Sequence, residues 1–319
     1  MSILNGVPFM GNKTKIVEEL LSVIFSRHND MTDFYDLCGG GGCVSFNASQ
    51  NRNILVHYNE IREEIYNLIS FIVSNDKMPD DWWDWVSREE FYECRNKVDA
   101  KSSMIKLVWS FGNRGISGGY LYGKEIVDLK YLAHQFVKFN DLEAINKIIN
   151  EYHIDISENM SNATMYERRI YLQNQAKKAD NNKCQLEHIQ RLERINDNFL
   201  NLFRTQHIER LEKVNNNFRD NSNIVTTNVS YDEVDITGNK PVIYCDIPYN
   251  STKTYDGIKF DYEKFYNWAR NSSFPVYFSE YSAPDDFICV WSKEKYCAIS
   301  SYKESRSTHI ERLFWNGIK

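Results

Sequence analysis

The sequence lacks the features that would place the chain in a membrane or in a disulfide-bonded secreted class. Its apolar runs are far shorter than the roughly 20 residues that cross a bilayer, and its N-terminus has no signal-peptide core. The seven cysteines are an odd number without CxxC spacing, and the seven histidines form no metal-binding pattern. We therefore expect a cytoplasmic protein with no membrane partner and no metal site.

An overall positive charge is also absent, although the charge is unevenly distributed. The net charge is −6, which argues against a protein that simply coats nucleic acid. Residues 160–219 nevertheless hold 11 Lys and Arg against 7 Asp and Glu, or +4, which leaves −10 on the rest of the chain. With 42% hydrophobic and 26% charged residues, the composition is that of an ordinary globular protein that has one basic stretch.

The two ends of the sequence have the pattern of one α/β domain, formed by residues 1–75 and 222–319. Strand-like runs are expected at 32–36, 53–58, 224–227, 241–245, 275–279, 287–291 and 298–302. Helices are expected around 16–24, 43–48, 61–72 and 261–270. A strand, a glycine turn, a helix, a strand and a helix begin a doubly wound, Rossmann-like sheet.

Residues 76–221 have a different character and are interpreted as an insertion that is mainly helical. The insertion is rich in aromatic residues at first, then punctuated by glycine at 111–123, then long and polar. Within it, residues 188–199 and 207–218 agree at 8 of 12 positions. Their apolar residues recur as a packing stripe, so we predict that this repeat is scaffold.

A run of four glycines at residues 39–42 lies where a strand turns into a helix. Missing side chains there let backbone N–H groups and the helix dipole approach a ligand closely. Asp36 precedes the run, and Glu60 follows the second strand, where such folds hold a ribose hydroxyl. The alternatives are an ordinary tight turn and an acid favoured by a helix dipole. A nicotinamide or flavin dehydrogenase would use the same turn and the same Glu60.

The sharpest signal is Asp246-Ile247-Pro248-Tyr249, which follows the apolar strand 242–245. The amino group of adenine is a poor nucleophile because its lone pair is delocalised into the ring. The Asp246 carboxylate and the Ile247 carbonyl are two acceptors that can hold its two protons and favour a nucleophilic nitrogen. The ring of Tyr249 can stack on the base. As a bare tetrapeptide, the pattern is a weak signal, because Asp-x-Pro-Tyr in a loop is mostly a turn.

Three motifs occur in the order of a known family. They are Pro8-Phe9-Met10-Gly11-Asn12-Lys13, Asp36-Leu37-Cys38-Gly39-Gly40-Gly41-Gly42 and Asp246-Ile247-Pro248-Tyr249-Asn250-Ser251-Thr252-Lys253-Thr254-Tyr255. Together they resemble the DNA adenine methyltransferases of the Dam type, especially phage-borne members. Ser279-Glu280-Tyr281 and the ending Glu311-Arg312-Leu313-Phe314-Trp315-Asn316 also look like that group. The resemblance covers residues 5–75 and 222–319, and the insertion only loosely.

The resemblance implies an enzyme of a bacterial or phage-infected cell that transfers a methyl group from S-adenosylmethionine to the 6-amino group of adenine in double-stranded DNA. Base flipping is implied, because an adenine inside a duplex cannot reach such a pocket. The catalytic loop would be Asp246, Ile247, Pro248 and Tyr249. The implied cofactor-binding residues are Phe9, Lys13, Asp36, Gly39, Gly40, Gly41, Gly42, Glu60 and Asp246. Phe9 and Lys13 would flank the methionine end of the cofactor.

Two departures from the family pattern bear on activity. Ile247 stands where the family usually has proline, which keeps the carbonyl but removes the fixed φ of the loop. Leu37-Cys38 replaces Pro-Phe before the glycines and alters packing under the cofactor. A methylase relative that binds DNA without catalysis is therefore an alternative. Asp246 favours adenine, since Ser there goes with cytosine amino groups and Asn with protein or RNA targets, and no Pro-Cys pair for cytosine-ring chemistry occurs.

The insertion is where the resembled family places its DNA-recognition region, and it holds the basic stretch. Its glycine-punctuated loop and its helices offer donors for bases and phosphates. The candidate DNA-binding residues are Asn113, Arg114, Lys124, Arg168, Arg169, Lys177 and Lys178. A solvated helix face is the competing interpretation of the last four.

Overall fold

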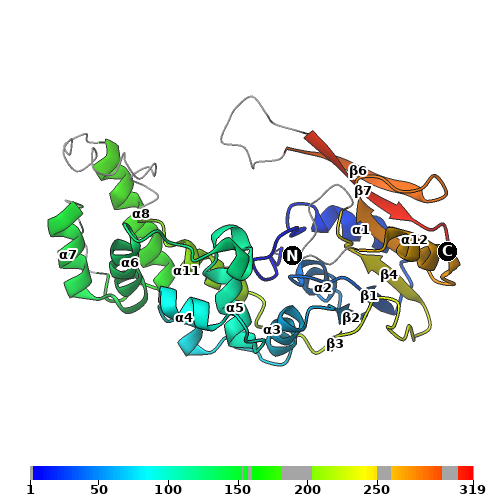
Figure 1. The fold of residues 1–319 in the computed structure, drawn as a ribbon, viewed down its shortest axis with the longest axis horizontal. Helices are drawn as coiled ribbons and strands as arrows, with labels where there is room; N and C mark the ends of the chain where they lie inside the picture. The colour runs from blue at the N-terminus through cyan, green and yellow to red at the C-terminus, as the bar shows by residue number, and fades with distance from the viewer. Residues whose placement is uncertain are drawn as a thin grey trace. The chain divides into compact units, whose positions relative to one another are not determined.

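The computed structural model describes residues 3–152, 154, 156, 160–181, 203–249, 260–296 and 308–318 (Figure 1). The chain divides into two compact units. Unit 1 comprises Met1–Met78, Lys97–Met104 and Lys213–Lys319, and unit 2 comprises Pro79–Asn96 and Ile105–Glu212. These bounds differ from the expected ones at 75/76 and 221/222, because residues 97–104 and 213–221 pack with unit 1.

A seven-stranded sheet forms the centre of unit 1, with the strand order β3-β2-β1-β4-β5-β7-β6 (Figure 1). The strands are β1 (Asp33–Asp36), β2 (Leu55–Asn59), β3 (Ile224–Thr227), β4 (Pro241–Cys245), β5 (Val276–Glu280), β6 (Ile288–Tyr296) and β7 (Thr308–Trp315). The first five are parallel, and β7 lies antiparallel between β5 and β6. The predicted Rossmann-like α/β fold is confirmed. The strand expected at 298–302 lies outside the described residues.

Helices cover both faces of this sheet, which explains why its central strands are apolar throughout. Strands β1, β4 and β5 are buried along their whole length. On one face, Phe265 of α12 (Tyr262–Asn271) packs in a cluster with Ile243 and Phe278. Tyr277 points to the opposite face, since neighbouring residues of a strand alternate. There its hydroxyl lies 2.9 Å from Nε2 of His28, which follows α1 (Val17–Arg27).

The strand order reverses between β1 and β4, and this reversal fixes where a ligand can bind. β1 continues to β2 on one side, whereas β4 continues to β5 on the other. Helices α2 (Cys43–Ala48) and α3 (Glu63–Val73) follow β1 and β2. In open α/β sheets, ligands bind outside the carboxyl ends of the strands at such a point. Asp36, Glu60 and Asp246 each lie at, or one residue beyond, the carboxyl end of a strand at this edge.

Unit 2 is helical in the part that the structure describes. Its elements are η1 (Asp80–Trp83), α4 (Arg88–Glu93), η2 (Phe111–Asn113), η3 (Gly115–Gly118), α6 (Val127–Phe139), α7 (Leu142–Tyr152) and α8 (Met165–Asn181). Helices α5 (Ala100–Val108) and α11 (Gln206–Asn215) cross the division between the units. α6 packs against α7 and α8 around Phe136, Ile148 and Leu172. None of the described helices has both the length and the apolar character needed to cross a membrane.

The second copy of the sequence repeat, residues 207–218, forms most of α11 and the turn that follows it. Its apolar positions Ile208, Leu211, Val214 and Phe218 are all buried. The prediction that the repeat is scaffold is confirmed for this copy. The first copy, residues 188–199, lies outside the described residues.

Candidate active site

The loop that leaves β4 is fastened to the body of unit 1 at its two middle residues. Ile247 is 1% exposed and packs in the cluster that includes Phe265 and Phe278. The hydroxyl of Tyr262 donates a hydrogen bond of 2.8 Å to the carbonyl of Pro248. An apolar anchor and a hydrogen bond thus hold the loop where the resembled family relies on a fixed proline φ. The departure at Ile247 leaves the loop attached to the core.

Lys13 places its ammonium group among the carboxylates of the same edge. Its Nζ lies 2.7 Å from Oδ1 of Asp246, 3.5 Å from Oε1 of Glu311 and 4.8 Å from the ring centre of Tyr249. Burial alone would lower the pKa of Lys13, but the charges of Asp246 and Glu311 outweigh burial and raise the pKa. The amine therefore stays protonated. Its ammonium therefore contacts both the loop 246–249 and Glu311.

Glu311 of β7 joins this group and was not among the predicted site residues. Tyr249 donates its hydroxyl to Oε1 of Glu311, whose side chain is almost completely buried. Burial and the nearby carboxylates raise the pKa of Tyr249 well above its usual value, so the phenol stays protonated and acts as the donor. The ring of Tyr249 also meets Tyr281 edge to face, with centroids 4.6 Å apart. The available sequence signal was its place in the ending 311–316, which resembles the family.

Asp36, at the end of β1, is completely buried and only half satisfied. Its Oδ2 accepts a hydrogen bond of 2.7 Å from the hydroxyl of Ser45. Its Oδ1 has no hydrogen-bond partner among the described residues. Burial raises the pKa of Asp36 to about 7, and the charges of Asp246 and Glu60 act in the same direction. A buried carboxylate oxygen of this kind is suited to a cationic or N–H-bearing ligand group.

The glycine run is required by the backbone and by close packing. Gly40 and Gly42 have φ of 47° and 75°, the left-handed region that favours glycine. A Cβ on Gly39 would lie 2.3 Å from the ring of Tyr58, whose hydroxyl donates to the carbonyl of Gly40 at 2.7 Å. A Cβ on Gly41 would lie 2.9 Å from Phe9. Of the predicted residues, Phe9 therefore lies beside Gly40 and Gly41.

Glu60 closes the turn from the side of β2. Its Oε2 accepts a hydrogen bond of 2.9 Å from the backbone N–H of Gly40. Its Oε1 accepts two bonds of 3.0 Å from the backbone and the Nε of Arg62. The guanidinium of Arg62, which the sequence analysis missed, lies 4.4 Å from the ring centre of Phe9. The carboxylate predicted to hold ribose hydroxyls is thus fixed at the mouth of the glycine turn.

The family model for D12 class N6 adenine-specific DNA methyltransferases matches residues 9–270, which include the glycine turn and the whole loop 246–249. The chain belongs to this family. It is accordingly a methyltransferase that uses S-adenosylmethionine to methylate the 6-amino group of adenine in DNA, and it flips the target base. No curated protein matches the chain. Strand β7 with Glu311 lies outside the matched residues.

The residues of this methyltransferase fit its cofactor, which carries a cationic sulfonium and an ammonium group. The edge of the sheet gathers more carboxylates than cations. The carboxylates are those of Asp36, Glu60, Asp246 and Glu311, and the cations are Lys13 and Arg62. This excess of negative charge, the unpartnered oxygen of Asp36 and the side-chain-free glycine turn all suit a cationic nucleoside. Among the described residues, no group of acids, histidines and cysteines could hold a metal ion.

Five of the seven predicted DNA-binding residues of the methyltransferase are fully or partly exposed on unit 2. Arg114, Lys124, Lys177 and Lys178 are exposed, and Asn113 is half-buried with φ of 57°. Asn113 and Arg114 lie between the strand-like residues Ser110 and Tyr120, which form an antiparallel bridge. The structure leaves their role in DNA binding as a prediction.

Arg168 must be withdrawn from the predicted phosphate contacts. Its guanidinium donates hydrogen bonds to the carbonyls of Val137 at 2.7 Å, Lys138 at 2.9 Å and Ala163. The first two carbonyls belong to the last turn of α6, whose carbonyls have no partner within the helix. Arg168 is a buried cap of α6, and all three of its guanidinium nitrogens are bound to backbone carbonyls.

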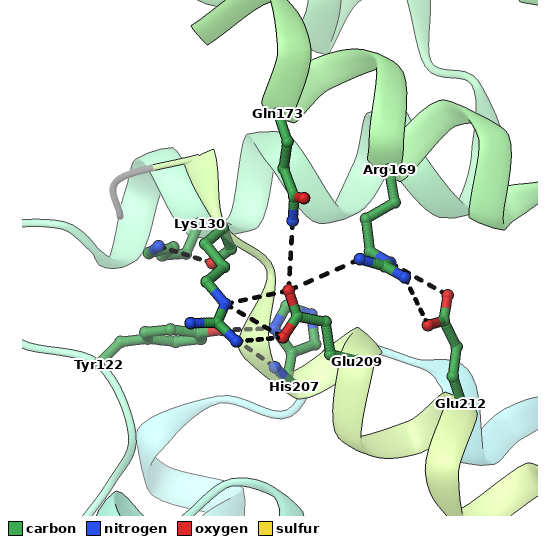
Figure 2. Close-up of polar contacts among 8 residues, drawn as sticks. Tyr122, Lys130, Arg169, Gln173, His207, Glu209 and Glu212 are labelled. Carbon is green, nitrogen blue, oxygen red and sulfur yellow. Dashed lines mark hydrogen bonds and ion pairs between the residues drawn. The ribbon is translucent and has the colours of Figure 1, made fainter. Parts of the chain in front are cut away.

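Arg169 is also bound within unit 2, as Figure 2 shows. Its Nε and one terminal nitrogen donate to the two carboxylate oxygens of Glu212, at 3.1 and 2.8 Å. Its other nitrogen lies 3.6 Å from Glu209, which also accepts from Gln173 and Arg204. The prediction that Arg169 contacts phosphate is therefore corrected in the same way: its charge joins α8 to α11.

Proposed function

We propose that Asp246, Ile247, Pro248 and Tyr249 form the catalytic loop of this methyltransferase. The ion pair between Lys13 and Asp246 is the observation that carries the proposal. It fixes the carboxylate at the carboxyl end of β4, beside the strand that ends in Asp36. The loop is thereby joined to the edge of the sheet where ligands bind in this class of fold.

The chemistry follows from the acceptors that this loop presents. The cofactor, when bound, supplies an activated methyl group on a good leaving group. The Asp246 carboxylate and the Ile247 carbonyl accept the two N–H bonds of the adenine amino group, which turns the nitrogen lone pair towards that methyl group. Tyr249 stacks on the flipped base and fixes its plane. The proton that leaves the methylated nitrogen passes to the carboxylate of Asp246, which already accepts that N–H bond.

We propose that the glycine turn and its neighbours bind the cofactor. Asp36 accepts from a cationic or N–H group of the cofactor through its Oδ1, and Glu60 accepts from the ribose hydroxyls. Phe9 and Gly39–Gly42 form the wall that the cofactor contacts. Lys13 acts on the catalytic loop, as its contacts with Asp246 and Tyr249 support.

We further propose that unit 2 is the target-recognition region and binds double-stranded DNA. The exposed cations Arg114, Lys124, Lys177 and Lys178 support phosphate contacts. Asn113 and Arg114 are the candidates for base contacts, because amide and guanidinium groups form paired hydrogen bonds with base edges.

The direct test is incubation with methyl-labelled S-adenosylmethionine and unmethylated DNA, followed by digestion to nucleosides. Label is expected in 6-methyladenine, and it should disappear in Asp246→Ala. The matched control is Asp235→Ala, which removes an exposed carboxylate from the same unit and should keep wild-type activity. Full activity in Asp246→Ala would refute the assigned loop. Binding of both ligands without labelled product in the wild type would instead support the non-catalytic alternative.

A further inference from the structure

We propose that Glu311 is a positioning residue for methyl transfer, one that fixes the side chains of Tyr249 and Asp246 relative to each other. The inference rests on the proposed function, because it takes the loop 246–249 as the catalytic loop. Glu311 lies on β7, beyond the residues that the family model matches.

The four side chains form one continuous chain of polar contacts. Tyr249 donates its hydroxyl to Oε1 of Glu311. The same oxygen lies 3.5 Å from Nζ of Lys13, and that ammonium lies 2.7 Å from Asp246. Glu311 is therefore bound to the stacking ring directly and to the catalytic carboxylate through one cation. Movement of either end of the loop must disturb this one carboxylate.

Burial makes these contacts obligatory. Glu311 and Lys13 are both almost completely buried, and a buried charge is strongly destabilising unless it is paired and hydrogen-bonded. Lys13 is shared between the carboxylates of Asp246 and Glu311, and the hydroxyl of Tyr249 is a further donor to Glu311. The hydrogen bond to this buried carboxylate thus directs the phenol towards β7.

The strand register explains how Glu311 reaches the site. β7 pairs antiparallel with β5, and Glu280, the last residue of β5, lies opposite Arg312. Because the two strands run in opposite directions, Glu311, the residue before Arg312, lies level with the first residue after the carboxyl end of β5. Tyr281 is this residue, and its ring packs edge to face against Tyr249. Tyr249 is thereby held from its hydroxyl end and from one ring edge, which leaves its orientation defined before a base arrives.

A purely structural role for Glu311 is the competing explanation, in which it only balances the charge of Lys13. The two roles differ in what the variants change. Loss of a structural ion pair lowers the temperature of unfolding and the amount of active enzyme, with the kinetic constants of the remaining enzyme intact. Loss of a positioning contact lowers kcat at unchanged cofactor affinity, because only the alignment of the reacting groups is affected.

The test compares Glu311→Gln, Tyr249→Phe and the double variant in the full-length enzyme. The matched control is Glu294→Gln, the same change at an exposed position of the neighbouring strand β6. Each single variant is expected to lower kcat by roughly 10- to 100-fold, the effect of a misalignment of about 1 Å, with the KM for S-adenosylmethionine within about 2-fold of wild type. The double variant should lose no more than about 3-fold beyond either single variant, because both act on the hydrogen bond between Tyr249 and Glu311: Glu311→Gln removes the charge of its acceptor, and Tyr249→Phe removes its donor.

A fluorescent base gives a readout that a structural role would not move. With 2-aminopurine at the target adenine, stacking on a fixed Tyr249 quenches the flipped base, so Glu311→Gln should show brighter emission at saturating DNA. Wild-type kcat in Tyr249→Phe, or a double variant whose losses multiply, would overturn the proposal, and Tyr249→Phe decides even where Glu311→Gln fails to fold. Full activity in Asp246→Ala would instead refute the catalytic loop itself, so the two failures are distinguishable.

Discussion

The ammonium of Lys13 lies 2.7 Å from the carboxylate of Asp246, although the two residues come from opposite ends of the sequence. The first motif was expected to flank the cofactor, and the last was expected to hold the base. The ion pair joins them into one group at the carboxyl edge of the sheet. Lys13 is therefore expected to affect the chemical step more than cofactor binding.

Replacement of Lys13 by methionine tests this assignment. Lys13→Met keeps the length of the side chain but leaves Asp246 and Glu311 without their shared cation, so kcat should fall by about 100-fold or more. Lys15→Met is the control, because Lys15 is exposed two residues away. Steady-state kinetics and a cofactor titration give the answer. A weakened affinity for S-adenosylmethionine with kcat unchanged would return Lys13 to the cofactor.

Truncation of Ile247 measures how the loop is anchored. Because Ile247 is buried in the core beside β5, Ile247→Ala should lower the free energy of unfolding of unit 1 by about 2–5 kcal/mol. Ile247→Val removes one methyl group and should cost about 0.5–1.5 kcal/mol. Urea unfolding followed by circular dichroism provides both values. A loss below the valine figure in the alanine variant would mean that the side chain does not hold the loop.

Cofactor affinity should depend on pH through Asp36. The pKa of Asp36 is raised to about 7, so below pH 7 the free enzyme carries a proton that a cationic ligand must displace. The Kd for S-adenosylmethionine should therefore rise by up to about 10-fold per pH unit below 7 and become constant above it. Calorimetric titrations from pH 5.5 to 8.5 measure the slope. Asp36→Asn should bind more weakly and without this slope, and an unchanged slope would assign it to another group.

Unit 2 should lose stability in mild acid because of His134. Burial lowers the pKa of His134 to about 4, whereas the unfolded chain takes up the proton near its ordinary value. The unfolded state therefore binds more protons as the pH falls from about 6.5 to about 4, and stability should drop across that window by about 3 kcal/mol. The buried Trp109, stacked 4.3 Å from His207, reports unfolding by its fluorescence. His134→Gln should reduce the drop without abolishing it, because burial also lowers the pKa of the neighbouring His207, and an unaltered profile would contradict the assignment.

The salt dependence of DNA affinity should change when an exposed arginine of unit 2 is replaced but not when a buried one is. Arg114→Ala should weaken DNA binding and reduce the slope of log K against log salt by about 1, as the loss of one phosphate contact does. Arg168→Ala should leave that slope unchanged and lower the unfolding temperature, because it uncaps α6. Fluorescence anisotropy at several salt concentrations measures the slopes. A reduced slope in Arg168→Ala would restore it as a phosphate contact.

The parallel strands of the sheet could be predicted because their burial is visible in the composition of each short segment. Strands buried on both faces must be apolar throughout, and the runs at 241–245 and 275–279 have that composition. The glycine turn and the acids beside it were predictable for the same reason, since a turn at a strand end depends on nearby residues. The sequence pattern did not indicate β7, which mixes Glu311 and Arg312 with apolar residues.

The misses have equally specific causes. Which acid folds back onto Lys13 depends on the order of the strands, and no local pattern encodes that order. The error at Arg168 and Arg169 was avoidable, because these residues lie on the same helical stripe as the buried Leu172 and Ala176. A count of charges does not distinguish a buried guanidinium from a solvated one. The position of each arginine relative to the apolar face of the helix does distinguish them.

The path of the chain through unit 1 has a consequence for the newborn protein. Strands β1 and β2 leave the ribosome early, but β4, which covers the exposed edge of β1, follows only after all of unit 2. Glu311 arrives later still, with β7. Domains generally fold as units, so the contacts among Lys13, Asp246, Tyr249 and Glu311 form only after β7 has been made. A polypeptide that stops before β7 lacks Glu311 and therefore lacks the acceptor to which Tyr249 donates.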